Sequence, residues 1–395
     1  MKLKSNALKN IALHSLLGIA MLAVAKVACA ASPDALLVQS LIDISHSQMN
    51  SALSSIDSVL KTNPNFRLAQ LVKGDILLAR SRPISKLGDV AGAPPDRIQG
   101  LREEALARVM RHEQRPDEDT VPSYLVEMRP EQKYAIVVDL DKSALYLYRN
   151  VDGGPQYVAD YYITSGKQSG EKVSEGDKKT PIGVYRVTGH LPESKLPAFY
   201  GSGAFPISYP NEWDRHEGRS GHGIWLHGTP PDTYSRVPKA SSGCVVLANH
   251  DLTEIGDYLQ LGVTPVIISD SIRWESRKEA EAVRQSVDDA LEKWKRDWES
   301  LDNDAYLGNY SKQFFSDTMG FPEWAKYKSK VNSAKSWVKI TISNVSAFLY
   351  PGKDGFFVVS FDQDYSSNNF HNKMRKRQYW IREGNAWKII YEGDA

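Results

Sequence analysis

The chain has 395 residues, of which 41% are hydrophobic and 25% charged, values typical of a folded protein with two or three domains. Its 49 basic and 48 acidic residues nearly balance, so charge gives no general basis for a nucleic-acid partner. Composition also gives no sign of a large disordered segment. These values favour a globular protein without nucleic-acid binding.

The first thirty residues have the features of a secretory signal peptide. Three early lysines precede an apolar run from Ile11 to Ala25, and the small residues Ala28-Cys29-Ala30 follow it. An uncleaved membrane anchor is the alternative, but the run is short for a span of about 20 apolar residues and Lys26 interrupts it. We therefore predict that residues 1–30 are removed on export and that the mature protein has no integral membrane segment.

Removal of the signal peptide leaves Cys244 as the only cysteine. Oxidising compartments outside the cytoplasm favour paired thiols, so a lone thiol there is a liability unless it is buried or reactive. Cys244 is therefore a candidate nucleophile. Without further context, a lone cysteine beside Val245 and Val246 is more often a small buried hydrophobic residue than a nucleophile, and this alternative stays open at this point.

Residues 31–131 are predicted to be a helical region followed by a linker. Apolar residues recur at helical spacing between residues 33 and 80, and Asn63-Pro64-Asn65 interrupts them. The pattern resembles one tetratricopeptide-like hairpin, which cannot bury its own apolar face and should dock on the next domain. A plain helical lead-in is the alternative. The proline-rich residues 81–122 indicate a linker, with a short helix around Leu101–Gln114 that can lie across a later domain.

Residues 132–272 are predicted to form a β-rich domain, and residues 273–395 a further α+β domain. A hairpin is expected over Ile136–Tyr148, followed by short strands separated by glycine and proline. The last domain starts with a long helical pattern over Glu275–Leu301 and ends in four strand candidates. A helix over a curved antiparallel sheet resembles the cone-shaped nuclear-transport-factor-like fold. The predicted fold class is therefore α+β with several domains.

Two stretches near the middle of the chain carry the candidate chemistry. One reads Gly-His-Gly-Ile-Trp-Leu-His-Gly-Thr and ends at Thr229, and the other reads Ser-Ser-Gly-Cys-Val-Val-Leu and starts at Ser241. A thiol attacks as thiolate and needs a base, and histidine, with an unperturbed pKa near 6.5, is its natural partner. The stretches therefore suggest a pairing of Cys244 with His227.

The residues around this pair predict how it could be assembled. Ile224–Leu226 is expected to be a buried strand ending at His227, and Val245–Leu247 another that begins after Cys244. If the strands are neighbours, both side chains can converge at one rim of the sheet. Ser242-Gly243 allows an exposed turn whose backbone amides can hold an oxyanion.

A zinc site is the alternative interpretation of this region. Four histidines, together with Cys244, are of the right type for ligands, but their spacings match no common zinc pattern. We therefore predict no metal and no cofactor. The histidines are His216, His222, His227 and His250.

These motifs resemble those of L,D-transpeptidase (YkuD-type) catalytic domains. His-Gly-Thr at 227–229 followed by Ser-x-Gly-Cys at 241–244 matches the family signature, and Asp177–Gly183 resembles its Lys-Thr-Pro-x-Gly turn. The resemblance covers about residues 133–270. It implies a periplasmic cysteine enzyme acting on peptidoglycan stem peptides, with His227 as base and the carbonyl of Gly228 orienting the imidazole.

Two positions depart from the family pattern. The common form reads Ser-His-Gly-Cys-Ile-Arg, whereas Ser242 replaces the histidine and Val246 the arginine. Substrate contacts are therefore expected to differ, and Arg219, Arg236 or Lys239 can supply the lost charge. With its transport-factor-like domain, this variant is similar to L,D-carboxypeptidases that set cell shape, and it also resembles a subgroup that detaches wall-anchored lipoprotein.

The resemblance implies acyl transfer at the L,D bond between diaminopimelate and D-alanine. The sequence leaves the acceptor open between water, the amine of another stem and a lipoprotein linkage. Two lost polar groups next to Cys244 favour water, because transfer to an amine needs a second stem held in place. A catalytically inactive wall-binding module is the alternative from another class of function.

Overall fold

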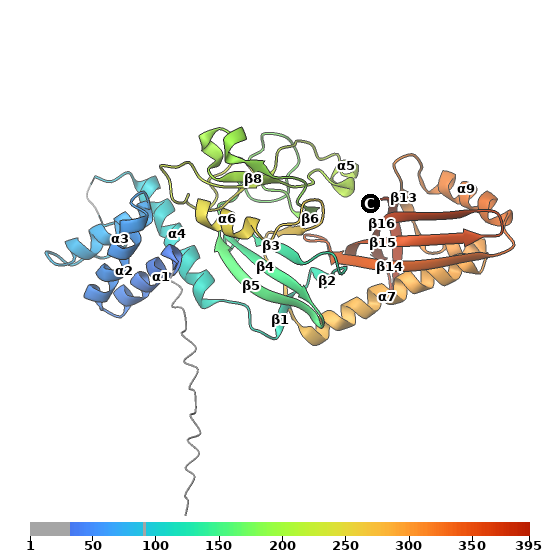
Figure 1. Cartoon of the computed structure of the whole chain (residues 1–395), viewed down its shortest axis with the longest axis horizontal. Helices are drawn as coiled ribbons and strands as arrows, with labels where there is room; N and C mark the ends of the chain where they lie inside the picture. Colours follow the sequence, from blue (N-terminus) through green and yellow to red (C-terminus); the bar gives the residue numbers. More distant parts are fainter. Residues whose placement is uncertain (1–31, 90–91) are drawn as a thin grey trace, which may run out of the picture. The chain divides into compact units, whose positions relative to one another are not determined.

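The computed structural model describes residues 32–89 and 92–395, so the predicted signal peptide lies outside the described residues. Along the chain, four helices come first, then a unit rich in short strands, then a long helix and a sheet of long strands (Figure 1). This order confirms the predicted α+β class with several domains. Within the described ranges, no helix is both long and apolar enough to cross a membrane.

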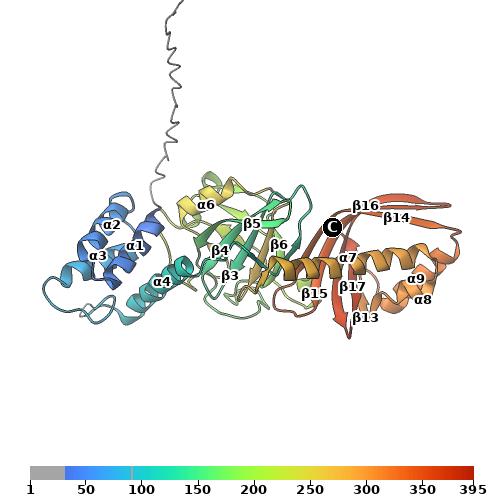
Figure 2. The same cartoon turned by 90° about the horizontal axis from the view of Figure 1, so that it is seen from below.

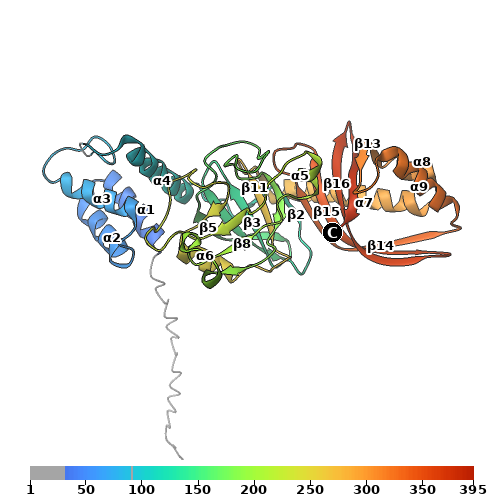
Figure 3. The ribbon, with the colours of Figure 1, turned by 90° about the horizontal axis from the view of Figure 1, so that it is seen from above.

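The N-terminal helices pack around one apolar core that includes Leu37, Ile56 and Phe66 (Figure 3). The predicted break at Asn63-Pro64-Asn65 is confirmed. The apolar residues before this break belong to two helices and not one, because Ser47 has a left-handed backbone with φ 62° that ends the first helix. The last helix is longer than predicted. The helices are α1 (Pro33–Ser45), α2 (Met49–Thr62), α3 (Arg67–Leu78) and α4 (Pro95–Glu113).

The helical region docks on the following domain, as expected for a helical hairpin that cannot bury its own apolar face. The Phe66 ring stacks on Tyr234 with centroids 4.1 Å apart, and Asn65 donates a hydrogen bond to the carbonyl of Pro231 at 3.0 Å. Arg111 of α4 forms an ion pair with Asp160. The segment between residues 230 and 236 is therefore in direct contact with the N-terminal helices.

The β-rich domain is built from two sheets that enclose a single apolar core. A five-stranded sheet has the order β5-β4-β3-β11-β6, and a four-stranded sheet has the order β10-β9-β8-β7. Ile136 and Leu145 of the first sheet meet Leu226 and Val245 of the second in the core. The predicted hairpin is confirmed as β3 and β4. The strands are β3 (Tyr134–Asp139), β4 (Ala144–Val151), β5 (Gly154–Tyr162), β6 (Gly183–Arg186), β7 (Leu191–Pro192), β8 (Gly203–Pro206), β9 (Trp225–His227), β10 (Val245–Val246) and β11 (Pro265–Ser269).

Short helices complete this domain. Leu252 and Ile255 of α6 pack into the same core as the two sheets. The short helices of this domain are η1 (Glu193–Lys195), η2 (Ala198–Tyr200), α5 (Glu212–His216) and α6 (Asn249–Gly256).

The C-terminal domain is a long helix laid across a six-stranded sheet (Figure 2). Val287, Leu291 and Trp294 of α7 pack on the sheet, which includes the buried Trp380. The helices are α7 (Arg277–Glu299), α8 (Asn303–Leu307) and α9 (Phe321–Ser333). The strands are β12 (Trp274–Ser276), β13 (Tyr310–Phe315), β14 (Val338–Leu349), β15 (Phe356–Ser367), β16 (His371–Glu383) and β17 (Ala386–Asp394).

Part of the predicted linker belongs to the C-terminal domain. β1 (Thr120–Pro122) pairs with β12, and β2 (Leu125–Glu127) is the edge strand beside β14. Val121 and Leu125 are 2% exposed. The burial of these apolar side chains explains why strands form in a stretch whose prolines indicated a linker.

We expect the ion pairs of α4 to be needed for stability. Arg108 is 2% exposed and pairs with Asp34 and Glu104, so Arg108→Met leaves the buried Glu104 without its cation, while Asp34 keeps its ion pair with Arg111. Removing one member of a buried ion pair costs about 3–5 kcal/mol in the free energy of unfolding. Urea unfolding would measure the loss. The control Arg97→Met, at an exposed position of the same helix, should stay within about 0.5 kcal/mol, and an equal loss in both variants would contradict a structural role for the pairs.

Candidate active site

The two strands expected to carry Cys244 and His227 are neighbours. β9 and β10 are parallel, with Leu226 opposite Val245 and His227 opposite Val246. Cys244 therefore precedes the first residue of β10, and His227 is the last residue of β9. Both side chains lie on the lining of one cleft.

The turn before Cys244 is shaped by Ser241. Its hydroxyl donates to the carbonyl oxygen of Cys244 at 2.6 Å and accepts from the amide of Gly243 at 3.0 Å. Gly243 has φ +130°, and a Cβ there would lie 2.8 Å from the carbonyl oxygen of Lys179. This position therefore needs glycine. Since the Gly243 amide already donates to Ser241, its predicted oxyanion role requires it to share or release that bond.

The Cys244 thiol is partly exposed and lies between polar neighbours. Its Sγ is 3.4 Å from the carbonyl oxygen of Gly223, to which it donates. Burial raises the pKa of the thiol, while a hydrogen bond from the Trp225 backbone and the positive charge of Arg236 act to lower it. The raised pKa means that the resting group is a neutral thiol.

The imidazole of His227 is 2% exposed and has a fixed orientation. Its Nδ1 lies 2.7 Å from the carbonyl oxygen of Gly228, which can only accept, so Nδ1 carries the hydrogen and Nε2 is left as the basic nitrogen. Burial lowers the pKa of His227 to about 4. The imidazole is therefore neutral at neutral pH and able to take a proton.

Aromatic side chains from η2 pack around the imidazole. The ring centroid of Tyr200 is 5.0 Å from that of His227, and Phe199 is 6.0 Å away. The amide of Gly228 donates to the carbonyl of Tyr200 at 3.1 Å, which ties β9 to η2. These contacts explain the burial that lowers the pKa of His227. No motif marks Phe199 or Tyr200 as site residues.

The active-site cleft has a volume of about 560 Å³. Cys244, His227 and Ser242 line it, whereas Gly228 and Gly243 are not among its lining residues. Cationic and aromatic side chains occur at its wall. They include Lys167, Lys172, Phe199, Tyr200 and Arg236.

Arg236 is the member of the predicted charge trio that faces the cleft. Arg219 is buried in ion pairs with Asp214 and Glu171, both at 3.1 Å, and Lys239 is exposed outside the lining. The Arg236 guanidinium stacks on Phe199 at 4.4 Å and, within the described residues, has no hydrogen bond or ion pair. It is thus available to a ligand.

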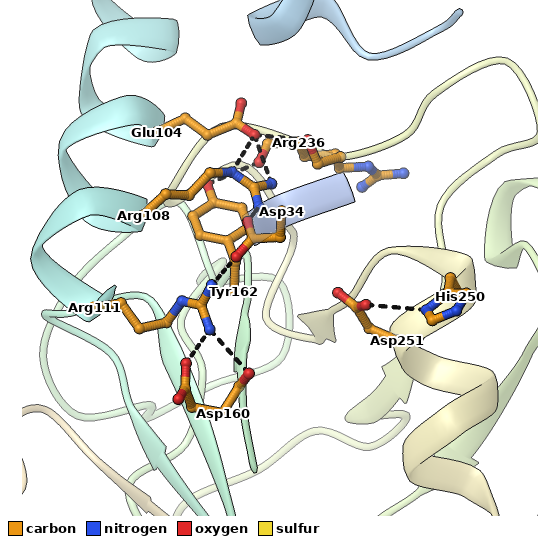
Figure 4. Close-up of polar contacts among 10 residues, drawn as sticks. Asp34, Glu104, Arg108, Arg111, Asp160, Tyr162, Arg236, His250 and Asp251 are labelled. Carbon is orange, nitrogen blue, oxygen red and sulfur yellow. Dashed lines mark hydrogen bonds and ion pairs between the residues drawn. The ribbon is translucent and has the colours of Figure 1, made fainter. Parts of the chain in front are cut away.

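The segment that carries Arg236 is anchored by the N-terminal helices (Figure 4). Ser235 donates to Glu104 of α4 at 2.6 Å, and Glu104 pairs with Arg108 at 2.8 Å. The Tyr162 hydroxyl donates to the carbonyl of Arg236 at 2.9 Å, while Arg108 lies 4.0 Å from the Tyr162 ring. In Figure 4 the Arg236 side chain extends away from these contacts. Its backbone is therefore held while its charge stays free.

Of the four histidines of the zinc alternative, His222 and His227 line the cleft with Cys244, whereas His216 and His250 lie elsewhere. His216 stacks on Phe315 with centroids 3.6 Å apart, and His250 lies 3.5 Å from Asp251. His222 lines the active-site cleft on an exposed loop. In the part of the chain that the structure describes, no group of three or more histidine, cysteine, aspartate or glutamate residues could hold a metal ion.

Comparison with known families assigns this fold. Residues 133–268 match the L,D-transpeptidase catalytic domain (YkuD), and residues 286–393 match the Cds6 C-terminal NTF2-like domain. The chain carries an L,D-transpeptidase domain. It is joined to an NTF2-like domain, which confirms the predicted resemblance of the C-terminal region to the transport-factor fold.

Two solved structures share this combination over nearly their whole length. Bd1075 of Bdellovibrio bacteriovorus is 29% identical, with a TM-score of 0.63, and the match covers 70% of this chain and 98% of Bd1075. The helical cell shape determining protein Pgp2 of Campylobacter jejuni is 26% identical, with a TM-score of 0.58, and the match covers 73% of this chain and 99% of Pgp2. No curated protein matches the chain.

The protonation states of the pair can be tested on the thiol. Because burial raises the pKa of Cys244 and lowers that of His227 to about 4, the resting pair is neutral and not a thiolate–imidazolium pair. The rate of iodoacetamide alkylation follows the thiolate, so we expect it to keep rising above pH 9. Mass spectrometry of the alkylated protein would give the rate at each pH. A plateau already reached below pH 7 would show a thiolate ion pair instead.

Proposed function

We propose that this protein cleaves the L,D bond between diaminopimelate and D-alanine in peptidoglycan stem peptides by acyl transfer through Cys244. The observation that supports it most is the pairing of β9 with β10, which sets Cys244 and the neutral, oriented His227 on one cleft of the L,D-transpeptidase domain. The similarity to Pgp2, a cell shape determining protein, supports a role in wall shape. Export to the periplasm, where peptidoglycan lies, follows from the predicted signal peptide at residues 1–30.

The proposed reaction has two steps. Nε2 of His227 takes the thiol proton as Sγ bonds to the diaminopimelate carbonyl carbon, and backbone amides near Cys244 stabilise the oxyanion. The C–N bond breaks as the imidazolium returns the proton to the departing amine of D-alanine. The resulting thioester then reacts with an acceptor, whose proton passes to His227 and on to the sulfur. No metal or cofactor takes part in this scheme.

Water is the acceptor that we propose. Val246, at the position of the family's arginine, is 2% exposed and apolar, so it cannot bind a carboxylate. Arg236 supplies a cation from another segment, and its free guanidinium suits the carboxylate of a terminal D-alanine. Recognition of a free chain end is the requirement of a carboxypeptidase.

The assignment of the reacting pair predicts loss of activity without loss of fold. Cys244→Ala removes the nucleophile and His227→Ala removes the base, so each should lower turnover of muropeptides by several orders of magnitude. Liquid chromatography with mass spectrometry would measure the products, and circular dichroism would check the fold. Turnover by Cys244→Ala at the wild-type rate would refute the assignment. No turnover of muropeptides by the wild type itself would favour an inactive wall-binding module.

The choice of water predicts the product. A time course on purified disaccharide tetrapeptide with excess amine acceptor should accumulate tripeptide without cross-linked dimer. Dimers linked between two diaminopimelate residues would show transpeptidation instead. Release of stem fragments from lipoprotein-linked sacculi, with no action on the tetrapeptide, would favour the lipoprotein-detaching alternative.

The role of Arg236 predicts a change in KM more than in kcat. Arg236→Gln removes the guanidinium that is proposed to bind the terminal carboxylate of the substrate. We therefore expect KM for the tetrapeptide to rise about tenfold or more. A substrate whose terminal D-alanine is amidated should bind the wild-type protein as weakly as the tetrapeptide binds Arg236→Gln. The KM for this amidated substrate should not change when Arg236 is replaced. Lys239→Gln, a nearby exposed cation outside the cleft lining, is the matched control and should change neither constant. Equal effects of Arg236→Gln on both substrates would contradict carboxylate binding.

A further inference from the structure

A second cavity, of about 280 Å³, lies where the L,D-transpeptidase domain meets the NTF2-like domain. Arg186 of β6 lines it from one domain, and Arg375 and Arg377 of β16 line it from the other. Arg129, which follows β2, is the fourth arginine. Figure 3 shows α5 beside β16 at this junction, where Glu212 binds Arg377. Glu212 is the one acidic side chain that lines the cavity in the described part of the chain.

One of the four arginines is fully paired. Nη1 of Arg377 donates to Glu212 at 2.8 Å, and its Nε donates to Ser360 at 3.2 Å. The hydroxyl of Tyr379 donates to the other oxygen of Glu212 at 3.0 Å. The one side-chain carboxylate on the lining is therefore already used, and the carboxylate of Ala395, which also lines the cavity, forms no ion pair with these arginines in the described structure.

The other three arginines are less well paired. Nε of Arg129 and both Nε and Nη2 of Arg375 are buried without a hydrogen bond, and each side chain has only a long ion pair, Arg129 with Glu131 at 3.6 Å and Arg375 with Asp362 at 3.5 Å. The Arg186 guanidinium has no hydrogen bond and no ion pair among the described residues. Buried donors without acceptors cost folding free energy, so these guanidiniums are arranged for something other than stability.

The arginines also repel one another. Burial, followed by the charge of Arg375, lowers the pKa of Arg129, and burial, followed by the charge of Arg377, lowers that of Arg186. An anion placed among them would relieve this repulsion and satisfy the unpaired donors. The arrangement is therefore unfavourable when empty and favourable when an anion is bound.

We propose that this cavity binds a small oxyanion group, a phosphate or a carboxylate, at the junction of the two domains. Guanidinium groups recognise both through two parallel hydrogen bonds, and the volume limits the ligand to a small group. Ser208 lies on the lining and can donate one more hydrogen bond. Because Arg186 and Arg375 belong to different domains, the bound group stabilises the contact between them. The cavity shares no lining residue with the active-site cleft, so this inference stands apart from the proposed reaction.

Titration of the full mature chain with sodium phosphate and with sodium acetate tests the proposal. Ionic strength is held constant with chloride, and isothermal calorimetry and melting temperature are the readouts. We expect saturable binding of at least one anion and a melting temperature that rises with its concentration. Arg186→Gln should fold, since it loses no ion pair, and should weaken binding about tenfold or more. Arg149→Gln, an exposed arginine on β4, is the matched control and should bind like wild type.

The outcomes separate the possibilities. Binding of phosphate alone identifies a phosphate group as the ligand, binding of acetate alone identifies a carboxylate, and binding of both shows that the site accepts either group. If Arg186→Gln proved unstable, Arg129→Gln would serve in its place. No saturable binding of either anion, or equal binding by wild type and Arg186→Gln, would overturn the proposal. Wild-type hydrolysis of muropeptides by Arg186→Gln would show that the two sites are separate.

Discussion

The parallel pairing of β9 with β10 is the constraint on which the candidate active site depends. The strands are only three and two residues long, yet β10 is held on both sides, because Val246 also exchanges two backbone hydrogen bonds of 2.9 Å with Thr164. Val245 and Leu226 are fully buried beneath the cleft. A shift of one residue in this pairing would turn these apolar side chains outward, so the core itself fixes the register that sets Cys244 beside the cleft.

Burial of the reacting groups has a chemical consequence. In the proposed reaction, the neutral thiol and neutral imidazole do not attract an ion or water shell as a charged pair would, and the thiolate forms only as its proton moves to His227. The Gly228 carbonyl and the ring of Tyr200 keep the imidazole in the orientation that this transfer needs. Free Arg236 then supplies positive charge near the sulfur at the stage when negative charge appears there.

The parts of this protein that could be predicted from sequence are those with local signals. Short apolar runs beside Cys244 and His227 predicted two strands, whose pairing only the structure shows, and alternation along Ile136–Tyr148 predicted the β3–β4 hairpin. Ser235 and Glu104 are far apart in the chain, so their hydrogen bond leaves no local pattern. The roles of Ser241 and Phe199 depend on three-dimensional contacts in the same way.

The strands β1 and β2, in the stretch predicted to be a linker, could not be predicted for a related reason. β2 is three residues long, and its partner on β14 lies about 220 residues later, so nothing near Leu125 indicates a sheet. Proline at 122 and the charged residues before it resemble a connection between domains. Long-range pairing of this kind is decided by the surface that β14 offers and not by local propensity.

That pairing has a consequence for how the protein is built. The chain contributes β1 and β2 to the C-terminal unit, leaves to form the whole L,D-transpeptidase domain, and returns through β12. In topology, the enzyme domain is therefore an insertion into the NTF2-like domain, attached at both of its ends. During synthesis β2 emerges long before β14. The six-stranded sheet can therefore be completed only after the inserted domain has been made.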